Sequence, residues 1–391
     1  MDILILWLIL RCMTSLFAGF ISTIRPMTPI ERALPFLPPT LPLSNWFERA
    51  FLSPWLSWDA EWYQRIVSQG YNQSDGTTGF HPLYPWLAAI LTRIGISPTF
   101  SLLIISSLAG IVLFYFFYKL AKLDLPLKDA FFGLLLFVLA PPSFIFFAPY
   151  SEALFLLLAV LCIFWTRQKL WWLAGLAGGL ATLTRQQGIF LLFPMAWELF
   201  EDAERNIKIA ITKWKDWLAL SLIPMGMIIW MAYRAIFLSD MKPDIGGLQK
   251  LIYSTLISSS ATKVVPIQRF IWPWQAFILS FEKLLTQPDL DLWVNIILGI
   301  LFLIILAVAW KKMRISYRIY SFVIAFVSFS YYTGPIHPYM GLTRHLLLAF
   351  PVFIGMAGII KKKSVRLLTI CLSVSGMLFL LVLYIMKTWV P

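Results

Sequence analysis

Long runs of apolar residues, separated by short polar segments, extend along almost the whole chain. A helix that crosses a bilayer needs about 20 predominantly apolar residues. Runs of this character cover residues 3–24, 98–118, 130–148, 152–166, 170–184, 187–199, 217–238, 291–310, 318–336, 345–360 and 367–387. We therefore predict an all-α, polytopic membrane protein with about eleven transmembrane helices.

The first run has features of a signal peptide, but the sequence favours a helix that stays in the protein. Arg11 interrupts the run, which ends at Arg25 and Pro26 without the small residues of a cleavage site. A charge at this depth in a membrane is costly unless it is paired. We expect Arg11 to contact a polar partner inside the helix bundle.

Two long polar segments interrupt the apolar runs, at residues 25–97 and 239–290. Within the first, the apolar stretch 82–91 is too short for a clear span and is typical of a re-entrant or interfacial helix. Within the second, residues 264–285 combine aromatic and basic side chains. This combination predicts an amphipathic helix in the membrane interface, with a weak transmembrane span as the alternative.

Basic residues gather in the short loops between the apolar runs. The loops concerned are residues 119–129, 167–169, 200–216, 311–318 and 361–366. A single threading of the chain puts all of them on one side of the membrane, and positively charged loops mark the cytoplasmic side. Both long polar segments then lie on the extracytoplasmic side, together with every candidate functional motif.

The composition supports one integral membrane domain over residues 1–391. Hydrophobic residues make up 60% of the chain and charged residues 13%, against about 25% charged in soluble proteins. The formal net charge of +13 does not indicate nucleic acid binding, because the basic residues lie in the short loops. There they set the orientation of the chain and contact anionic membrane lipids.

The cysteines and histidines do not form a metal-binding pattern. The cysteines are typical of small core residues, because they lie far apart within apolar runs, at Cys12, Cys162 and Cys371. The histidines lack ligand spacing, and the first long loop has no acidic pair of the Asp-x-Asp type. We expect no tightly bound metal and no cofactor, and loss of activity in a chelator would contradict this.

Asp59 begins the segment WDAEWYQRIVSQGY in the first long loop. Read as a helix, this segment has one face formed by Asp59, Trp62, Tyr63, Ile66 and Val67. Glu61 points about 200° away from Asp59. A carboxylate at the head of an apolar face beside a membrane is a candidate general base. The alternative is that Asp59 caps the helix.

Four further motifs place polar residues beside apolar runs: GFHPLYPW with His81, APYSEALF with Glu152, TLTRQQG with Arg185 and Gln186, and GLTRHLLLAFP with Arg344 and His345. Each has a structural alternative. Glu152 would complement a helix dipole, Arg185 would mark a turn at the interface with its head group in water, and Arg344 would end an ordinary loop.

Taken together, these motifs bring one carboxylate and several cations to one face of the membrane. That combination suits a reaction with a general base and a phosphate leaving group. Arginine fits phosphate because its planar guanidinium donates two parallel hydrogen bonds. A phosphate carried on a lipid has to be bound near the bilayer surface, where these loops are expected.

The motifs resemble a known family. WDAEWYQRIVSQGY followed by GFHPLYPW is similar to the pattern of the second GPI mannosyltransferases (PIG-V) and their bacterial relatives. APYSEALF, TLTRQQG, the WPW of residues 272–274 and TRHLLLAFP resemble later blocks of the family, in the expected order over nearly the whole chain. The resemblance implies a GT-C glycosyltransferase bundle.

The resemblance also implies a sugar donor on a polyprenyl phosphate, a mannosyl group, a lipid or glycan acceptor and an inverting single displacement. Asp59 matches the catalytic base. Arg185, Arg344 and His345 match positions suited to the donor phosphate, and Tyr63, His81, Glu152 and Gln186 complete the expected substrate site. His81 stands where many relatives have phenylalanine, which leaves open whether it contacts substrate or packs.

Two other functions stay open at this stage. A transporter or lipid flippase would use the same charges to line a pathway, and would distribute them through the depth of the spans. A non-catalytic scaffold for envelope assembly would tolerate Asp59→Asn. The compact loops favour a prokaryotic plasma membrane, with the endoplasmic reticulum membrane as the alternative.

Overall fold

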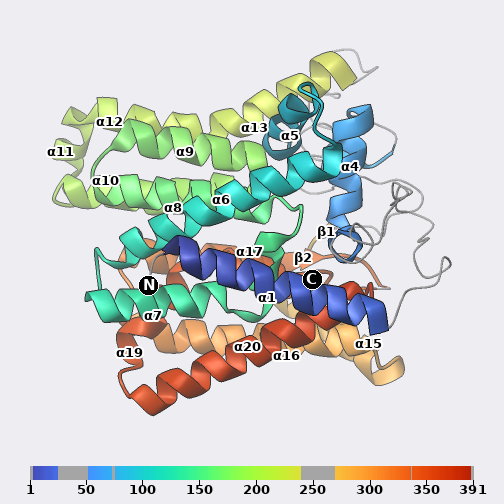
Figure 1. Cartoon of the computed structure of the whole chain (residues 1–391). Coiled ribbons are helices and arrows are strands. Elements are labelled where there is room, and N and C mark those ends of the chain that lie inside the picture. Colours follow the sequence, from blue (N-terminus) through green and yellow to red (C-terminus); the bar gives the residue numbers. More distant parts are fainter. Residues whose placement is uncertain (1–2, 25–51, 73–74, 239–268, 336, 389–391) are drawn as a thin grey trace.

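The computed structural model describes residues 3–24, 52–72, 75–238, 269–335 and 337–388. It is a bundle of helices that run mostly side by side (Figure 1). Five described helices are long and apolar enough to cross a membrane, at Ile3–Ile24, Pro98–Ala121, Trp214–Leu238, Leu290–Lys312 and Lys363–Ile385. The predicted helical membrane protein is confirmed, and the total of eleven crossings stays a prediction.

The described first half of the chain forms one helix ahead of the first long loop, four helical elements within that loop and a series of helices after it. The elements are α1 (Ile3–Ile24), η1 (Ser53–Trp55), α4 (Asp59–Gln69), η2 (Thr77–Gly79), α5 (Leu83–Thr92), α6 (Pro98–Ala121), α7 (Leu127–Val138), η3 (Pro141–Phe147), α8 (Glu152–Arg167), α9 (Trp171–Thr184), η4 (Gln186–Leu191), α10 (Leu192–Asp202) and α11 (Ile207–Thr212).

The second half continues the bundle and contains the two strands found among the described residues. The elements are α12 (Trp214–Leu218), η5 (Ala219–Ser221), α13 (Leu222–Tyr233), η6 (Arg234–Leu238), β1 (Arg269–Phe270), α15 (Pro273–Thr286), α16 (Leu290–Ala309), η7 (Trp310–Lys312), α17 (Ile315–Ser330), β2 (Tyr331–Tyr332), α18 (Leu342–Leu347), α19 (Pro351–Ile359) and α20 (Lys363–Ile385).

The structure corrects three of the expected spans. The run 130–148 is bent by 81° between α7 and η3, where Pro141 and Pro142 cannot continue a regular helix. The run 345–360 is divided into α18 and α19, and α19 starts at Pro351. The run 187–199 begins as the 3-10 helix η4 before α10.

The helices found in the two long loops agree with the sequence prediction, and a short pair of strands accompanies them. α5 is a short helix of 10 residues, and α15 provides the helix expected in the second long loop; residues 239–268 lie outside the described part, and the interfacial position of α15 stays a prediction. The predicted all-α class is confirmed, and the described residues add one short antiparallel pair of strands, β1 and β2, with Arg269 opposite Tyr332.

Glycines bring α9 and α13 into very close contact. A Cβ added at Gly226 of α13 would lie 2.2 Å from the carbonyl oxygen of Gly179 in α9. A Cβ at Gly175 would lie equally close, 2.2 Å, to the carbonyl oxygen of Ala219 in η5. Small residues allow helix backbones to approach in membranes. This contact fixes α9, whose last turn leads into the site described below.

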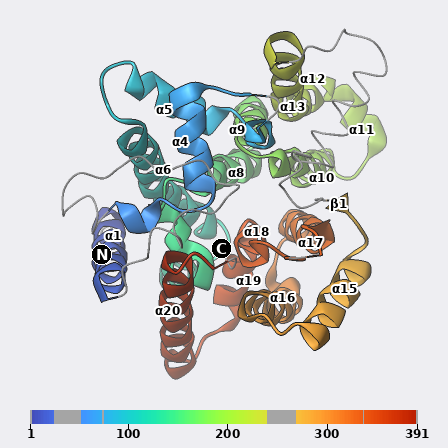
Figure 2. The same cartoon turned by 90° about the vertical axis from the view of Figure 1, so that its right-hand side faces the viewer.

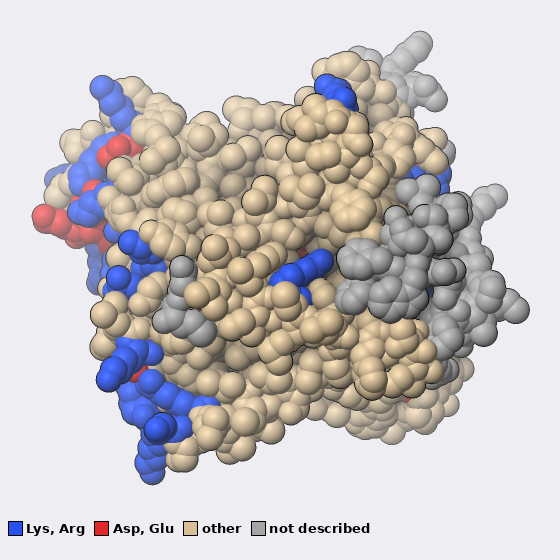
Figure 3. All heavy atoms as spheres, in the orientation of Figure 1, with Lys and Arg blue, Asp and Glu red and all other residues tan. Residues whose placement is uncertain are grey.

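Ion pairs join the basic loops at one end of the bundle. Asp124 binds Arg167 (Oδ2–Nη1 2.9 Å), and Glu201 binds Arg314 (Oε2–Nη2 3.2 Å). Further pairs link loop 167–169 to loop 200–216 and loop 119–129 to loop 361–366: Lys169 with Asp202, and Lys361 and Arg366 with Asp129. Figure 3 shows Lys and Arg gathered at this end. The basic loops therefore lie together at one end of the bundle, as the prediction requires, and the cytoplasmic location of this end stays a prediction.

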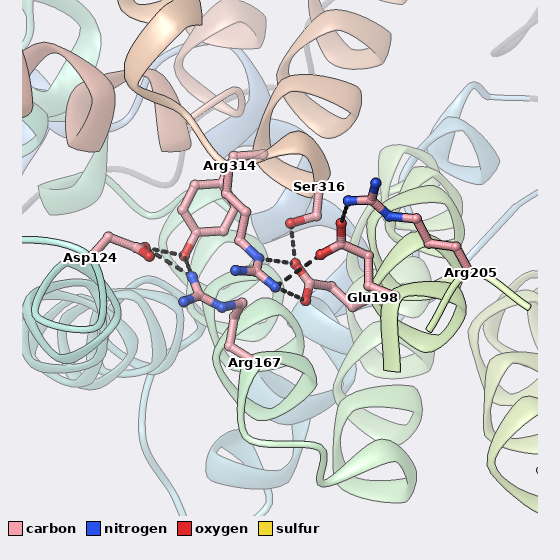
Figure 4. Close-up of polar contacts among 8 residues, drawn as sticks. Asp124, Arg167, Glu198, Arg205, Arg314 and Ser316 are labelled. Carbon is pink, nitrogen blue, oxygen red and sulfur yellow. Dashed lines mark hydrogen bonds and ion pairs between the residues drawn. The ribbon is translucent and has the colours of Figure 1, made fainter. Parts of the chain in front are cut away.

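The centre of this basic end is a compact network of charged and hydroxyl groups (Figure 4). Arg314 binds both carboxylate oxygens of Glu198, with Nη2–Oε2 at 2.8 Å, and the hydroxyl of Ser316 donates to Glu198. Glu198 belongs to α10, whereas Arg314 and Ser316 lie at the start of α17. The network therefore fastens α10 to α17.

α4 lies across the opposite end of the bundle (Figure 1), and Figure 2 looks onto that end. The start of α8 and the end of α9 lie at this end too, because both helices have their other termini at the basic loops. Arg11 lies between the two ends in α1 and donates to the carbonyl oxygen of Phe147 in η3. The expected polar partner of Arg11 is thus a backbone carbonyl.

Candidate active site

Asp59 is the first residue of α4 and its side chain does not cap the helix. The N-cap residue is Trp58, which makes no side-chain capping bond and has a positive φ of 58°. The carboxylate of Asp59 instead accepts a hydrogen bond from Arg344 (Oδ2–Nη1 2.6 Å). The capping alternative is therefore wrong, and the Asp59 side chain, 22% exposed, is held at the surface of a buried charged cluster.

Arg344 lies in α18 and links both acidic residues of the site. Gly341, in a left-handed conformation with φ 66°, forms the N-cap of this short helix. The Arg344 guanidinium binds Asp59, and its Nε lies 3.3 Å from Oε1 of Glu152. The guanidinium carbon also lies 5.4 Å from the ring centre of Tyr150, a cation–π contact.

Glu152 begins α8 and is completely buried. Its Oε1 accepts a hydrogen bond from Arg185 (Nη1–Oε1 2.7 Å) and also faces Arg344. Glu152 therefore contacts two arginines, in addition to placing a negative charge in the first turn of α8. Glu152 Oε2 and Arg185 Nε are buried and have no hydrogen-bond partner within the described residues. Buried polar atoms left in this way are available to a ligand.

Arg185 occupies the break between α9 and η4 that the TRQQG motif predicts. Its backbone is extended, with φ −153°, and ends α9 at Thr184. Gly188 makes the sharp break possible, because a Cβ there would lie 2.3 Å from the backbone nitrogen of Thr182. The Arg185 side chain is 12% exposed and also donates to Ser151 Oγ at 3.1 Å.

Tyr63 completes the cluster from the second turn of α4. Its hydroxyl donates to Ser151 Oγ (2.7 Å), beside the Arg185 guanidinium. Burial raises the pKa of the Tyr63 hydroxyl, despite the nearby Arg185. Tyr63 is therefore a neutral hydrogen-bond donor. On the predicted face of α4, Tyr63 and Ile66 are buried and the other members are half-buried.

The contacts define a site, here called the arginine–carboxylate cluster, formed by Asp59, Tyr63, Ser151, Glu152, Arg185 and Arg344. It draws on α4, α8, α9 and α18, with 285 positions between Asp59 and Arg344. The sequence predicted one carboxylate among cations, whereas the structure brings two carboxylates and two guanidinium groups together. Their formal charges cancel.

His81 lies beside the cluster and fastens the first loop to α9. Its Nδ1 donates to the carbonyl oxygen of Thr182 (2.7 Å), and its ring lies 6.2 Å from that of Trp230. Burial lowers the pKa of His81 to about 4, and the cations of Arg185 and Arg234 contribute. The imidazole is neutral at pH 7, and its Nε2 is then a hydrogen-bond acceptor.

Gln186 and His345 do not join the cluster within the described part of the chain. Gln186 is half-buried at the start of η4, next to Arg185. His345 is buried, and its ring lies 5.8 Å from that of Tyr331. Sequence reasoning did not identify Ser151 or Tyr150, although both stand in the APYSEALF motif, immediately before Glu152.

The fold is similar to that of solved membrane transferases. The crystal structure of ArnT from Cupriavidus metallidurans bound to undecaprenyl phosphate matches with a TM-score of 0.51 and 11% identity, over 98% of this chain and 76% of that chain. Its apo form gives 0.50 at 11% identity, over the same shares of 98% and 76%. The apo oligosaccharyltransferase of Archaeoglobus fulgidus gives 0.46 at 10%, over 98% of this chain and 56% of that chain. No curated protein sequence matches the chain.

This fold, with helices long and apolar enough to cross a membrane, defines an integral, multi-pass membrane protein that is similar in fold to ArnT. The sequence profile of the family described as Mannosyltransferase (PIG-V) matches residues 2–203, more than half of the chain. The chain belongs to this mannosyltransferase family. Family membership favours the enzyme over the transporter and scaffold alternatives.

Proposed function

We propose that the protein transfers a mannosyl group from a polyprenyl-phosphate donor to a hydroxyl of a lipid or glycan acceptor, with inversion at the anomeric carbon. The observation that carries the proposal is the hydrogen bond between Asp59 and Arg344, which puts a carboxylate beside a phosphate-binding type of side chain. The undecaprenyl phosphate bound to ArnT supports the class of donor.

In the proposed reaction, Asp59 accepts the proton of the acceptor hydroxyl. The hydroxyl oxygen forms a bond to the anomeric carbon, and the bond from that carbon to the phosphate oxygen breaks with its electron pair. The leaving polyprenyl phosphate changes from a diester with one negative charge to a monoester with two. General base catalysis typically contributes about 10²–10⁴-fold to such a step.

Arg185 and Arg344 would stabilise the charge that develops on the phosphate. Glu152 would keep the two guanidinium groups in place, since it contacts both. Tyr63 and Ser151 would fix the orientation of Arg185 through their hydrogen bonds. Gln186, His81 and His345 border the cluster and would form the outer wall of the substrate site.

Asp59 would have to exchange partners during the reaction. In the structure Arg344 donates to its Oδ2 (Oδ2–Nη1 2.6 Å), so this oxygen already has a partner where the acceptor hydroxyl would bind. The four formal charges of the cluster cancel, so no cation in it lacks a carboxylate partner. A donor phosphate that binds Arg344 would therefore have to replace Asp59 there. Donor binding would then release Asp59 to receive the acceptor proton, which predicts that donor binds before acceptor.

The donor class is tested with washed membranes of expressing cells, which also contain acceptors. Labelled mannose is supplied on a polyprenyl phosphate or on a nucleotide, with membranes lacking the protein as control. We expect incorporation into lipid or glycan product from the polyprenyl donor alone. Incorporation that depends on the protein and proceeds directly from the nucleotide sugar would contradict the proposal.

A further inference from the structure

The segment that leads into α4 is fastened to the other end of the chain. The hydroxyl of Tyr384, in the last turn of α20, donates to the carbonyl oxygen of Trp55 (3.0 Å). Just beyond α20, Lys387 donates to Glu61 (Nζ–Oε1 2.8 Å). These contacts join residues 329 and 326 positions apart, on either side of Asp59.

The Lys387–Glu61 ion pair is buried and separate from the arginine–carboxylate cluster. The side chains of Lys387 and Glu61 are 8% and 2% exposed. Glu61 contacts Lys387, just beyond α20, whereas Asp59, two positions earlier, contacts Arg344 of α18. Because burying an ion pair gives little net stability, its occurrence beside the catalytic segment indicates a requirement for defined geometry.

The backbone between these two contacts is strained. Trp58 has a φ of 58°, which a residue with a bulky side chain rarely adopts. Such a conformation persists only where the surrounding structure imposes it. A third contact acts here, because the Tyr150 hydroxyl donates to the carbonyl oxygen of Ser57 (2.7 Å). The ring of Tyr150 also lies 6.1 Å from that of Tyr384.

We propose that the end of α20 is a positioning element for the catalytic helix, in which Lys387 and Tyr384 hold residues 55–61 so that Asp59 meets the acceptor hydroxyl. This inference rests on the proposed role of Asp59. Tyr384 and Lys387 are positioning residues, because they contact the segment that carries Asp59 and not the arginine–carboxylate cluster.

Loss of the positioning contacts should affect turnover more than donor binding. A misplacement of about 1 Å costs about 10²-fold in rate. Arg185 keeps its contact with Glu152 (2.7 Å) when α20 is altered, so the donor phosphate retains that partner. We therefore expect kcat to fall by roughly 10-fold to 10²-fold, with the KM for donor changed by less than about twofold.

The test uses the double variant Glu61→Gln/Lys387→Met, which removes the ion pair without leaving a buried charge unpaired. Tyr384→Phe removes one hydroxyl and provides a milder variant that keeps the fold. The charge-exchanged variant Glu61→Lys/Lys387→Glu should restore part of kcat. The matched control is Arg65→Met, which removes an ion pair of the same helix, to Asp75 (2.8 Å), that does not involve α20.

We expect a lower kcat in the double variant and in Tyr384→Phe, with unchanged donor KM and partial recovery in the charge-exchanged variant. A kcat equal to that of the Arg65→Met control in both variants would overturn the inference. Unchanged kcat with reduced thermal stability would also overturn it, because it would show a merely structural role.

A second readout does not depend on activity. Spin labels on Ser68→Cys and Arg93→Cys, both exposed in the wild type, report the position of α4 relative to α5. The inference predicts a broader distance distribution in the double variant, and an unchanged distribution would contradict it. If wild type transfers no sugar, the proposed function fails while this measurement still tests the role of α20.

Discussion

At the scale of single residues, the two arginines of the cluster have different partners. Arg344 contacts both carboxylates, Asp59 and Glu152. Arg185 contacts Glu152 and the hydroxyl of Ser151. In the proposed reaction Arg344 would control whether the base is available, whereas Arg185 would stabilise charge on the donor phosphate. The two positions should differ in their response to the same substitution.

We expect Arg344→Lys to reduce kcat by about 10²-fold, because an ammonium group cannot replace a planar guanidinium that meets two carboxylates. Arg185→Lys should mainly raise the KM for donor. Steady-state transfer assays on purified protein separate the two effects. Arg205→Lys, at an exposed ion pair of the basic end, is the control. Identical changes in kcat and KM for both variants would contradict the assignment.

His81 gives a prediction on pH. Its pKa of about 4 lies below the ordinary value of 6.5, so the unfolded chain binds more protons between these values. Stability is fully present above pH 6.5 and is lost as pH falls towards 4. At about 1.4 kcal/mol per pKa unit, the full loss below pH 4 is roughly 3.5 kcal/mol, of which about 2 kcal/mol falls between pH 7 and pH 5. Thermal unfolding in detergent at pH 7 and pH 5 measures it.

The control is His81→Phe, compared with wild type at both pH values. The variant loses the bond to Thr182 and should be less stable at pH 7. Its stability should change less than that of wild type between pH 7 and pH 5. An equal change in both proteins would show that His81 is not the group responsible.

At the scale of elements, the position of Arg185 depends on how α9 packs against α13. Gly226→Ala would put a Cβ 2.2 Å from the Gly179 carbonyl oxygen, so the two helices must separate. We expect a loss of about 1–3 kcal/mol in the free energy of unfolding, together with lower transfer activity. Unfolding in detergent and the transfer assay provide the two measurements.

The same substitution elsewhere is the control. At Gly358 in α19 a Cβ would have its nearest neighbours at 3.5 and 3.7 Å, which are ordinary contacts. Gly358→Ala should therefore be neutral or slightly stabilising, since alanine favours the helix. Equal effects at the two glycines would show that the close contact of α9 with α13 does not determine the packing.

Local sequence determined much of the helix pattern but not its bends. The break at Arg185 was predictable because a charge and Gly188 interrupt two apolar runs. The bend of α7 was not expected, since Pro141 and Pro142 lie inside a run that hydropathy treats as continuous. The start of α19 at Pro351 was not expected for the same reason, because this proline also lies inside an apolar run.

The cluster was predictable only in part. Charged residues in polar motifs outside the basic loops made Asp59, Glu152, Arg185 and Arg344 visible in the sequence. The pairing of Asp59 with Arg344 was not visible, because the two residues lie 285 positions apart and nothing local connects them. Pairings of this kind depend on how the whole bundle folds.

At the scale of the whole molecule, the two ends of the bundle are chemically different. One end carries the ion pairs of the basic loops, such as Asp124–Arg167. The other carries the arginine–carboxylate cluster, at the opposite terminus of α8. If the basic end is cytoplasmic, catalysis takes place on the extracytoplasmic side.

Cysteine labelling in intact cells tests this orientation. In a variant without the native cysteines, Gln69→Cys reports the cluster end and Lys362→Cys the basic end; both positions are exposed. A membrane-impermeant maleimide should label the first in intact cells and the second only after permeabilisation. The opposite pattern would place the cluster in the cytoplasm and contradict the proposed topology.

The central claim is that Asp59 is the general base, and the most direct measurement compares wild type with Asp59→Asn under single-turnover conditions. Purified protein in nanodiscs receives labelled polyprenyl-phosphate mannose, with total membrane lipid of the host as acceptor, and donor binding is measured on the same samples. We predict that the variant binds donor at least as tightly, because Arg344 loses its competing carboxylate, but transfers mannose about 10²–10⁴-fold more slowly. Transfer at the wild-type rate would show that Asp59 is not the base.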